Sequence, residues 1–298
     1  MSDHAPIVTV GIPTFNRDLL IGRAVNSILS QDYPNIEIVI SDNCSTDSTP
    51  SVCQDLCAQD ARIRYIRQPS NIGATRNFAA VLKQASGEYF MWLGDDDHVD
   101  HNYISTTLRE LQRDPSLALV SGLARYYRGG KLIDTGRKFS VEAAAWWSRV
   151  AEYYWKVSDN GVFYGLMRTS TIRQVTLKNA LGGDWLAIAC VAASGKVVML
   201  KQTAVHRELG GASQTHAQTA RTLGLPRSHA LFPYISIAAN AFADIAANGS
   251  SYRQYGPVQR RLAGALVFLV LLARALTTSL VELLVIVRDN VRRKPDTA

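Results

Sequence analysis

The sequence predicts an α/β fold in which helices flank a mostly parallel sheet, followed by a helical C-terminal extension. Over roughly the first hundred residues, short apolar segments alternate with segments of helical periodicity. A polar loop follows each of the main apolar segments. This alternation favours parallel strands joined by right-handed helical crossovers. The carboxyl ends of such strands lie along one edge of the sheet, where ligands bind in open α/β folds.

The prediction is organised around the segment Tyr89–Asp97. Tyr89 to Leu93 form an apolar run that indicates a strand buried on both faces, and Gly94 and three acids follow. Three adjacent carboxylates repel one another unless a cation or hydrogen bonds hold them. Carboxylate oxygens favour Mg²⁺ or Mn²⁺, and Mg²⁺ usually takes one or two carboxylates plus substrate phosphates. A solvated acidic turn is the alternative.

Strands are also expected upstream of this segment, at residues 7–12, 36–40 and 63–66, each leading to a helix. Three strand ends therefore place the loops Pro13–Arg17, Asp42–Asp47 and Asp95–Asp97 at one edge of the sheet. A crevice of nucleotide size is the expected result. Downstream, helices are expected at 100–113, 141–155 and 228–247, strands at 117–120, 162–168 and 196–200, and a hairpin at 125–131.

Composition and charge narrow the class of protein. The 298 residues are 47% hydrophobic and 19% charged, as in ordinary globular proteins, and the net charge is +7. From Arg253 onward, eight basic residues stand against three acidic ones. The apolar residues between them favour a membrane surface over nucleic acid as the partner. The four cysteines contain no C-x-x-C pair and the N-terminal segment lacks a signal-peptide pattern, so we expect reduced thiols and a cytoplasmic location.

Four motifs, in this order, resemble the signature of family 2 glycosyltransferases with the GT-A fold. They are IPTFNR at 12–17, SDNCSTD at 41–47, NIGATRN at 71–77 and DDD at 95–97. The resemblance implies a GT-A-like, Rossmann-type sheet that binds a nucleotide-sugar donor. It also implies similarity to the sugar transferases of bacterial cell-surface polysaccharides.

The resemblance implies roles for individual residues. The residues expected to bind the nucleotide sugar are Pro13, Thr14, Asn16, Arg17, Asp42, Asn43, Arg76, Asp95, Asp96 and Arg207. Asp42 is expected to face the base or ribose. Asp97 is expected to ligate Mn²⁺ or Mg²⁺, with Asp95 and His206 as further ligands. The family commonly has an acid where this chain has Asn43, which leaves the base preference open. A surface helix arginine is the alternative for Arg76.

A second candidate site is the segment Gly182-Gly183-Asp184-Trp185, which precedes a helical stretch. An inverting sugar transfer needs a carboxylate on the acceptor side to take a proton from the attacking hydroxyl. We predict that Asp184 is this base, with Asp159 in reserve, and that Trp185 is a platform for the acceptor sugar. Capping of the helix by Asp184 is the alternative.

The character of the chain changes towards its C-terminal end, and we divide it into a catalytic domain at 1–215 and a helical extension at 216–298. Arg274 separates the apolar stretches 262–273 and 275–287. A central charge costs a membrane-spanning helix about 2.5–3.5 kcal/mol, so we predict two short helices on a membrane surface. A helical bundle or a dimer face is the alternative, and a homo-oligomer stays open.

The predicted function is that of a metal-dependent, inverting glycosyltransferase. It would move a sugar from a nucleotide-diphosphate donor to a lipid-linked glycan in cell-surface polysaccharide or glycoconjugate synthesis. The protein is expected to be peripheral on the inner face of the cell membrane, with no nucleic-acid partner. Two alternatives are a sugar nucleotidyltransferase, which would release pyrophosphate, and a non-catalytic membrane-associated binding protein.

Overall fold

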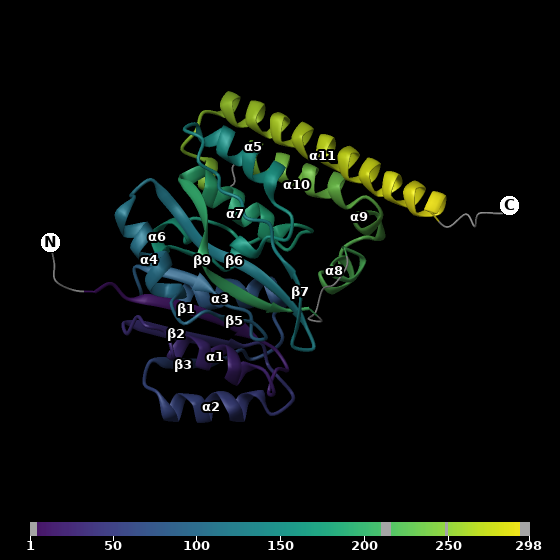
Figure 1. The fold of residues 1–298 in the computed structure, drawn as a ribbon. Coiled ribbons are helices and arrows are strands. Elements are labelled where there is room, and N and C mark those ends of the chain that lie inside the picture. The colour runs from purple at the N-terminus through teal and green to yellow at the C-terminus, as the bar shows by residue number, and fades with distance from the viewer. Residues whose placement is uncertain (1–4, 210–215, 248–249, 293–298) are drawn as a thin grey trace.

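The computed structural model describes residues 5–209, 216–247 and 250–292. In this part of the chain, nine strands form one sheet, and helices cover both of its faces (Figure 1). The strands are β1 (Val8–Thr14), β2 (Ile36–Asp42), β3 (Ile63–Arg67), β4 (Tyr89–Trp92), β5 (His98–Val99), β6 (Leu117–Arg128), β7 (Lys131–Thr135), β8 (Leu166–Arg168) and β9 (Lys196–Glu208). Their order is β3-β2-β1-β4-β8-β6-β9-β5, and β7 pairs with β6.

Helices connect most of the strands and make up the C-terminal part. They are α1 (Ile21–Leu29), α2 (Thr49–Gln59), α3 (Ala74–Gln84), α4 (Tyr103–Arg113), α5 (Trp146–Lys156), α6 (Thr169–Ile172), α7 (Gly183–Ser194), α8 (His216–Thr222), α9 (Arg227–Leu231), α10 (Pro233–Ala246) and α11 (Pro257–Arg292). Two 3₁₀ turns, η1 (Gly161–Tyr164) and η2 (Ser250–Tyr252), complete the described elements.

The first half of the chain confirms the predicted parallel sheet. β3, β2, β1 and β4 pair in parallel, and their registers bring the carboxyl ends of β1, β2 and β4 to one edge. β1 continues through Pro13, beyond the predicted end of the strand. The last pair between β1 and β4 joins Gly11 and Trp92, so Pro13 needs no amide hydrogen on that side.

The second half differs from the prediction in the extent of its elements. β6 and β9 are 12 and 13 residues long and pair in parallel, whereas only short strands were predicted there. The predicted strand at 162–168 begins instead with η1, and β8 covers only its end. Residues 162–167 are buried and mostly apolar, and periodicity alone does not separate a buried strand from a buried turn. The predicted hairpin at Gly129 and Gly130 is present, and both glycines have positive φ.

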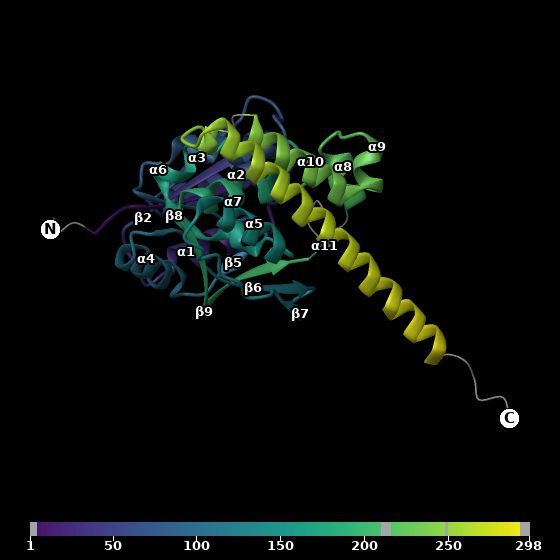
Figure 2. The same ribbon diagram turned by 90° about the horizontal axis from the view of Figure 1, so that it is seen from above.

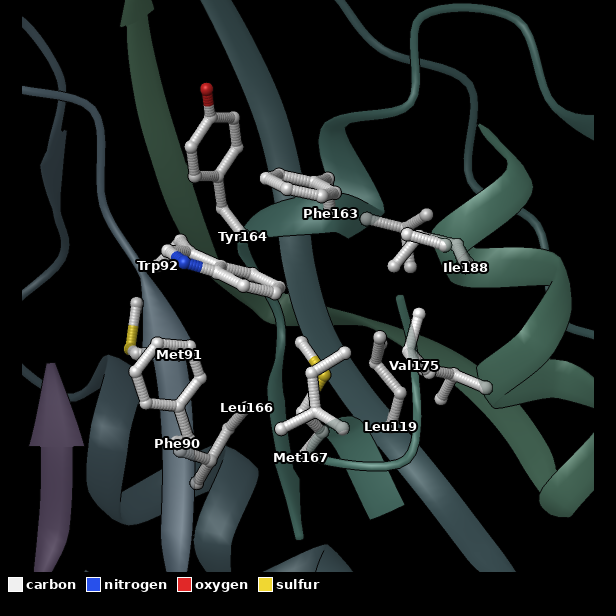
Figure 3. Packing of buried hydrophobic residues seen from close by; sticks show 14 of the residues in the cluster. Phe90, Met91, Trp92, Leu119, Phe163, Tyr164, Leu166, Met167, Val175 and Ile188 are labelled. Carbon is white, nitrogen blue, oxygen red and sulfur yellow. The ribbon is translucent and has the colours of Figure 1, made fainter. Parts of the chain in front are cut away.

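An aromatic stack ties the central strand to η1. The Trp92 ring lies parallel to the Phe163 ring, with 4.8 Å between the centroids, and Phe90 meets Trp92 edge-on at 4.9 Å. The Trp92 Nε1 donates to the Phe78 carbonyl at 3.0 Å, so the polar atom of this fully buried ring is satisfied. Figure 3 shows the stack, with the Tyr164 hydroxyl pointing away from it. The core therefore fixes where Tyr164 and its neighbours leave the apolar interior.

The prediction of two short C-terminal helices is wrong, because α11 is a single helix of 36 residues. Its sequence has no glycine or proline after Gly264, so nothing breaks it at Arg274. Its first half packs on α10 and α5 through buried Val267 and Leu271, and its last turns extend beyond the body (Figure 2). No helix in the described ranges is both long enough and apolar enough to span a bilayer. Val267 and Leu271 belong to the same apolar cluster as the sheet, and the boundary at 215 stays a prediction.

We expect Trp92→Ala to lower the free energy of unfolding by about 3–5 kcal/mol, because it removes a fully buried ring and leaves a cavity beside Phe163. Denaturation in urea, followed by circular dichroism, measures this. Trp155 is 53% exposed and serves as the matched control, with an expected loss for Trp155→Ala within about 0.5 kcal/mol. Equal losses for the two variants would contradict the packing described.

Candidate active site

A cleft of about 1040 Å³ opens at the carboxyl edge of β1, β2 and β4. The predicted nucleotide-binding residues that line it are Pro13, Thr14, Arg17, Asn43, Asp95, Asp96 and Arg207, and the predicted metal ligand Asp97 lines it as well. Lining residues that sequence reasoning did not single out include Asn71, Asn77, Tyr126, Arg128, Tyr164 and Glu208. The structure therefore brings the three predicted loops together and adds a wall from β6 and β9.

The acidic segment after β4 turns its carboxylates into the protein. Asp97 is only 2% exposed, and its amide donates to the Gly94 carbonyl at 3.2 Å. A Cβ at position 94 would lie 2.7 Å from Asp97 Oδ2, so glycine is needed for the side chain to fold back. The Asp95 carboxylate lies 3.5 Å from Arg17 Nε and accepts a weak hydrogen bond from the Phe15 amide at 3.4 Å. These acids are therefore not a solvated turn.

Burial dominates the protonation of both acids. It raises the pKa of Asp97 to about 7, with Arg207 opposing the shift and Asp96 adding to it. It raises the pKa of Asp95 to about 6, with Thr14, Arg17 and the Phe15 amide opposing the shift and the repulsion of Asp96 adding to it. Carboxylates held in this state gain from any added positive charge nearby.

Arg207 is the cation that already faces Asp97. Its Nε lies 3.4 Å from Asp97 Oδ2, and its guanidinium lies over the Tyr164 ring at 4.7 Å and the Tyr126 ring at 5.6 Å. Both contacts with Asp97, from this side chain and from the Glu208 amide at 3.3 Å, are long for charge-assisted hydrogen bonds. The oxygens of the Asp97 carboxylate are thus only loosely held. Arg207 lies beside the cleft, as predicted.

Two asparagines form the wall of the cleft on the side of β2 and α3. Asn43 Nδ2 donates to Asn71 Oδ1 at 2.9 Å, and Asn43 Oδ1 accepts from the Ile72 amide at 2.8 Å. Behind them, buried Asn77 on α3 donates to the Ser41 carbonyl at 2.8 Å. The sequence signal for Asn77 was a polar residue at an apolar position of a helix, which the prediction did not use.

The expectation that Asp42 faces the base or ribose is wrong, because its side chain is fully buried behind this wall. One oxygen accepts from the Ser45 amide at 2.9 Å and the other from the Tyr65 hydroxyl at 2.7 Å. Asp42 therefore fixes the loop that carries Asn43. Asn16 also acts within the loops, because its Oδ1 accepts from the Thr46 amide at 2.8 Å and it does not line the cleft.

The expectation that His206 ligates the metal is not supported, because both of its ring nitrogens already have partners. Nε2 lies 2.7 Å from Asp100 Oδ1, and Nδ1 lies 2.9 Å from the Tyr127 hydroxyl. The ring also stacks on His98 with 4.5 Å between centroids. Side chains alternate along β9, so His206 and Arg207 point to opposite faces of the sheet. Of these two side chains, only that of Arg207 reaches the cleft.

Asp184 lines a second, smaller cavity of about 210 Å³. Arg207 and Tyr164 line both cavities, so the two are neighbours. Asn160, which has positive φ, donates to Asp184 Oδ2 at 2.9 Å, and the Tyr153 hydroxyl donates to Asn160 Oδ1 at 2.7 Å. Asp184 lies in the first turn of α7, but its side chain makes no capping hydrogen bond. Gly182 is the N-cap residue of α7, so the capping alternative for Asp184 is not supported, and the carboxylate lines the cavity.

Three further predicted residues lie elsewhere. Trp185 is buried, and the Arg274 guanidinium lies 5.2 Å from the centre of its ring, so it offers no platform to an acceptor. Arg76 is exposed on α3 and does not line the cleft. This agrees with the alternative prediction, a surface arginine on a helix. Asp159 lines neither cavity, and its carboxylate accepts from the Gly161 amide at 2.8 Å.

A divalent cation fits the acidic end of the cleft. Two carboxylates with raised pKa values, the partly buried Asp95 and the buried Asp97, need positive charge, and one of the Asp97 oxygens is only weakly engaged. No cluster of three or more His, Cys, Asp or Glu side chains suited to a metal occurs among the described residues. Two carboxylates completed by substrate phosphates and water match the way Mg²⁺ is usually bound.

Comparison with known families decides the class of protein. The family model described as glycosyl transferase family 2 matches residues 9–176, more than half of the chain. The chain belongs to glycosyl transferase family 2. The predicted family and enzyme class are thereby confirmed, and neither the nucleotidyltransferase nor the non-catalytic alternative is supported.

Relatives of this glycosyltransferase match only in part. It is 41% identical over 106 residues to a Campylobacter jejuni GalNAc(5)-diNAcBac-PP-undecaprenol beta-1,3-glucosyltransferase, covering 35% of this chain and 34% of the relative. It is 34% identical over 140 residues to an Escherichia coli chondroitin synthase, covering 46% of this chain and 20% of the relative. The chain thus spans about a third of the length of the first protein and a fifth of the second.

Solved structures confirm the GT-A fold. S. aureus TarS aligns with a TM-score of 0.60 at 16% identity, over 87% of this chain and 70% of the other. The mannosyltransferase PcManGT of Pyrobaculum calidifontis, solved with GDP-Man and Mn²⁺, aligns with a TM-score of 0.59 at 17% identity, over 98% of this chain and 82% of the other.

We expect the stability difference between Asp97→Asn and the wild type to depend on pH in metal-free buffer. The raised pKa of Asp97 means that the folded state binds its proton more tightly than the unfolded state. Protonated Asp97 therefore adds its full contribution to the stability of the fold below pH about 4, the pKa of the carboxyl group in the unfolded chain. This contribution is lost as the pH rises to about 7, the pKa in the folded protein. Asparagine carries no charge to bury, so the melting temperature of the variant relative to wild type should rise over this window and then level off.

Differential scanning calorimetry in EDTA measures both proteins across that range. Glu110→Gln, at an exposed surface ion pair with Arg113, is the control and should show no such rise. A constant difference between Asp97→Asn and wild type at every pH would contradict the burial of the charge.

Proposed function

We propose that this protein is a metal-dependent, inverting glycosyltransferase that moves a sugar from a nucleoside-diphosphate donor to an acceptor hydroxyl. One observation carries the proposal: the acidic cleft and the Asp184 cavity share Arg207 and Tyr164 as a common wall. Donor and acceptor can thus bind side by side, with an acid and a cation on the donor side and a carboxylate on the acceptor side.

On the acceptor side, Asp184 takes the proton of the attacking hydroxyl. The amide of Asn160 donates to Asp184 Oδ2 at 2.9 Å, which fixes the carboxylate and leaves its other oxygen for the acceptor. Attack from this side, opposite the departing diphosphate, inverts the sugar carbon. Positioning of the two reactants in neighbouring cavities supplies much of the rate enhancement.

On the donor side, this chain holds the diphosphate and meets the charge that gathers on it. Asp97 and Asp95 would hold a divalent cation, which when bound offsets negative charge on the leaving group. Arg207 faces the same end of the cleft and adds a fixed positive charge from the protein. Asp97 is almost fully shielded from solvent, so its electrostatic interactions are stronger than they would be in water.

Several relatives support the substrate classes. S. aureus TarS has been solved with UDP-GlcNAc and PcManGT with GDP-Man and Mn²⁺, which supports a nucleotide sugar as donor and Mn²⁺ or Mg²⁺ as the cation. The Campylobacter relative is named for an undecaprenol-diphosphate glycan. We therefore propose a lipid-linked glycan as acceptor, in the synthesis of a cell-surface polysaccharide or glycoconjugate.

We expect Asp184→Asn to lower kcat for sugar transfer by about a hundredfold or more, because an amide cannot take the proton. Binding of UDP or GDP with Mn²⁺ should stay within a few-fold of wild type, since Asp184 lies outside the donor cleft. A thermal-shift screen of UDP, GDP, UDP-GlcNAc and GDP-mannose, with and without Mn²⁺, identifies the donor and measures this binding.

In the same thermal-shift screen, Asp97→Asn should lose the stabilisation by nucleotide that depends on Mn²⁺, whereas Asp184→Asn should keep it. Loss of nucleotide binding in Asp184→Asn to the same degree as in Asp97→Asn would show that Asp184 is structural. Full turnover by Asp184→Asn would remove it from the mechanism.

We also propose that the exposed side of α11 rests on the membrane that carries the acceptor, which would place the enzyme on the inner face of the cell membrane. Leu262, Leu269 and Leu276 are 67%, 62% and 73% exposed. Their spacing of seven residues puts them on one side of the helix. Exposed leucines on a helix within a basic segment suit an anionic lipid surface.

We expect replacement of these three leucines by serine to abolish co-sedimentation with vesicles of phosphatidylglycerol and phosphatidylcholine, while thermal stability changes little. Replacement of exposed Leu132 and Ile133 on β7 by serine is the matched control and should leave binding intact. If the wild type ignores vesicles but is a dimer by light scattering, and the serine variant is a monomer, the leucines form an interface between copies instead.

A further inference from the structure

Arg274 is the only charged residue between Leu262 and Val281, a stretch that is otherwise apolar or small. It lies in the middle of α11 and is partly buried against the body of the protein. Burial lowers the pKa of its guanidinium, which is nevertheless far too basic to lose its charge. A buried charge in an apolar helix is costly unless its partners compensate it, so the contacts of Arg274 indicate what it is for.

Two of these contacts are with α5 and with α7, the helix whose first turn carries the candidate base. Arg274 Nη1 donates to the Tyr154 carbonyl near the end of α5 at 2.7 Å. Its guanidinium also lies 5.2 Å from the centre of the Trp185 ring in the first turn of α7. One side chain thus clamps α5 and α7 together at their ends nearest the smaller cavity.

Each of these contacts is connected to Asp184 through one or more neighbouring residues. Trp185 is its neighbour in the chain. On the other side, Tyr153, next to Tyr154, donates through its hydroxyl to Asn160 at 2.7 Å, and Asn160 donates to Asp184 at 2.9 Å. Tyr153 is fully buried and Asn160 is 2% exposed, so neither has room to adjust independently of the helices.

We infer that Arg274 is a positioning residue for Asp184: the C-terminal helix holds the catalytic carboxylate in place through α5 and α7. The inference rests on the proposed role of Asp184. It assigns α11 a part in the reaction itself, separate from any contact that its exposed leucines make. The simpler alternative is that Arg274 only anchors α11, in which case its loss would weaken the fold without acting on Asp184 in particular.

Arg274→Met tests this, because methionine keeps most of the length and apolar volume but loses the charge and the hydrogen bond. Hydrogen–deuterium exchange of the full chain is the first readout. Peptides covering 157–165 and 183–188 should exchange faster than in wild type, while peptides from β1 and β4 stay unchanged. Arg261→Ala, at an exposed arginine of the same helix, is the control and should change neither region.

Turnover is the second readout, measured as nucleoside diphosphate released from UDP-GlcNAc or GDP-mannose, whichever stabilises the protein with Mn²⁺. A misplaced base should lower kcat in Arg274→Met by about ten- to a hundredfold, with nucleotide affinity unchanged. Arg274→Lys can still donate to the Tyr154 carbonyl and lie over Trp185, and it should recover most of the lost rate.

The outcomes separate this inference from the proposed function. If Asp184→Asn keeps full turnover, the proposed function fails, whatever Arg274→Met does. If Asp184→Asn is inactive but Arg274→Met changes neither exchange nor kcat, the inference alone is overturned. It is also overturned if Arg274→Met lowers nucleotide affinity and protection throughout the molecule, because that is the behaviour of an anchor.

Discussion

Negative charge buried at the end of the central strand is the constraint on which the site depends. Asp97 is almost fully buried, and the raised pKa values of Asp97 and Asp95 show that nearby positive charge does not compensate them completely. The protein places Arg207 opposite Asp97, from a strand more than a hundred residues further along the chain. Such a site is unfavourable when empty of cations and favourable when a metal and a diphosphate fill it, which is the property a donor site needs.

The length of β6 and β9 brings a positive charge to this buried carboxylate. Arg207 reaches Asp97 because β9 continues beyond the point where a short strand would end, paired in parallel with β6. The same extension brings Tyr126 from β6 under the guanidinium of Arg207, together with Tyr164 from η1. The wall between the donor cleft and the Asp184 cavity is therefore made of long-range contacts, and both cavities depend on it.

The surroundings of Asp184 are set by packing from two directions. From the core, Trp92 stacks on Phe163 and fixes η1, which presents Tyr164 to the cleft. From the C-terminal part, α11 packs on α5, and Arg274 contacts both α5 and α7. Asp184 thus lies where an aromatic core and a C-terminal helix meet, and α11, which follows the family-matched region, contacts both α5 and α7 beside it.

Arg207 was expected in the cleft only from the resemblance to the family, whereas the sequence by itself determined the alternation of strands and helices, the three polar loops at one edge of the sheet and the presence of Asp95, Asp97 and Asn43 in the cleft. These follow from local rules, because the carboxyl ends of parallel strands meet wherever the fold alternates. Only the tertiary structure decided which side chains turn inward. Asp42 is held behind the wall by Tyr65, His206 by Asp100 and Tyr127, and Trp185 by Arg274. The direction of each depends on a partner distant in sequence, and no local pattern of residues encodes where that partner will lie.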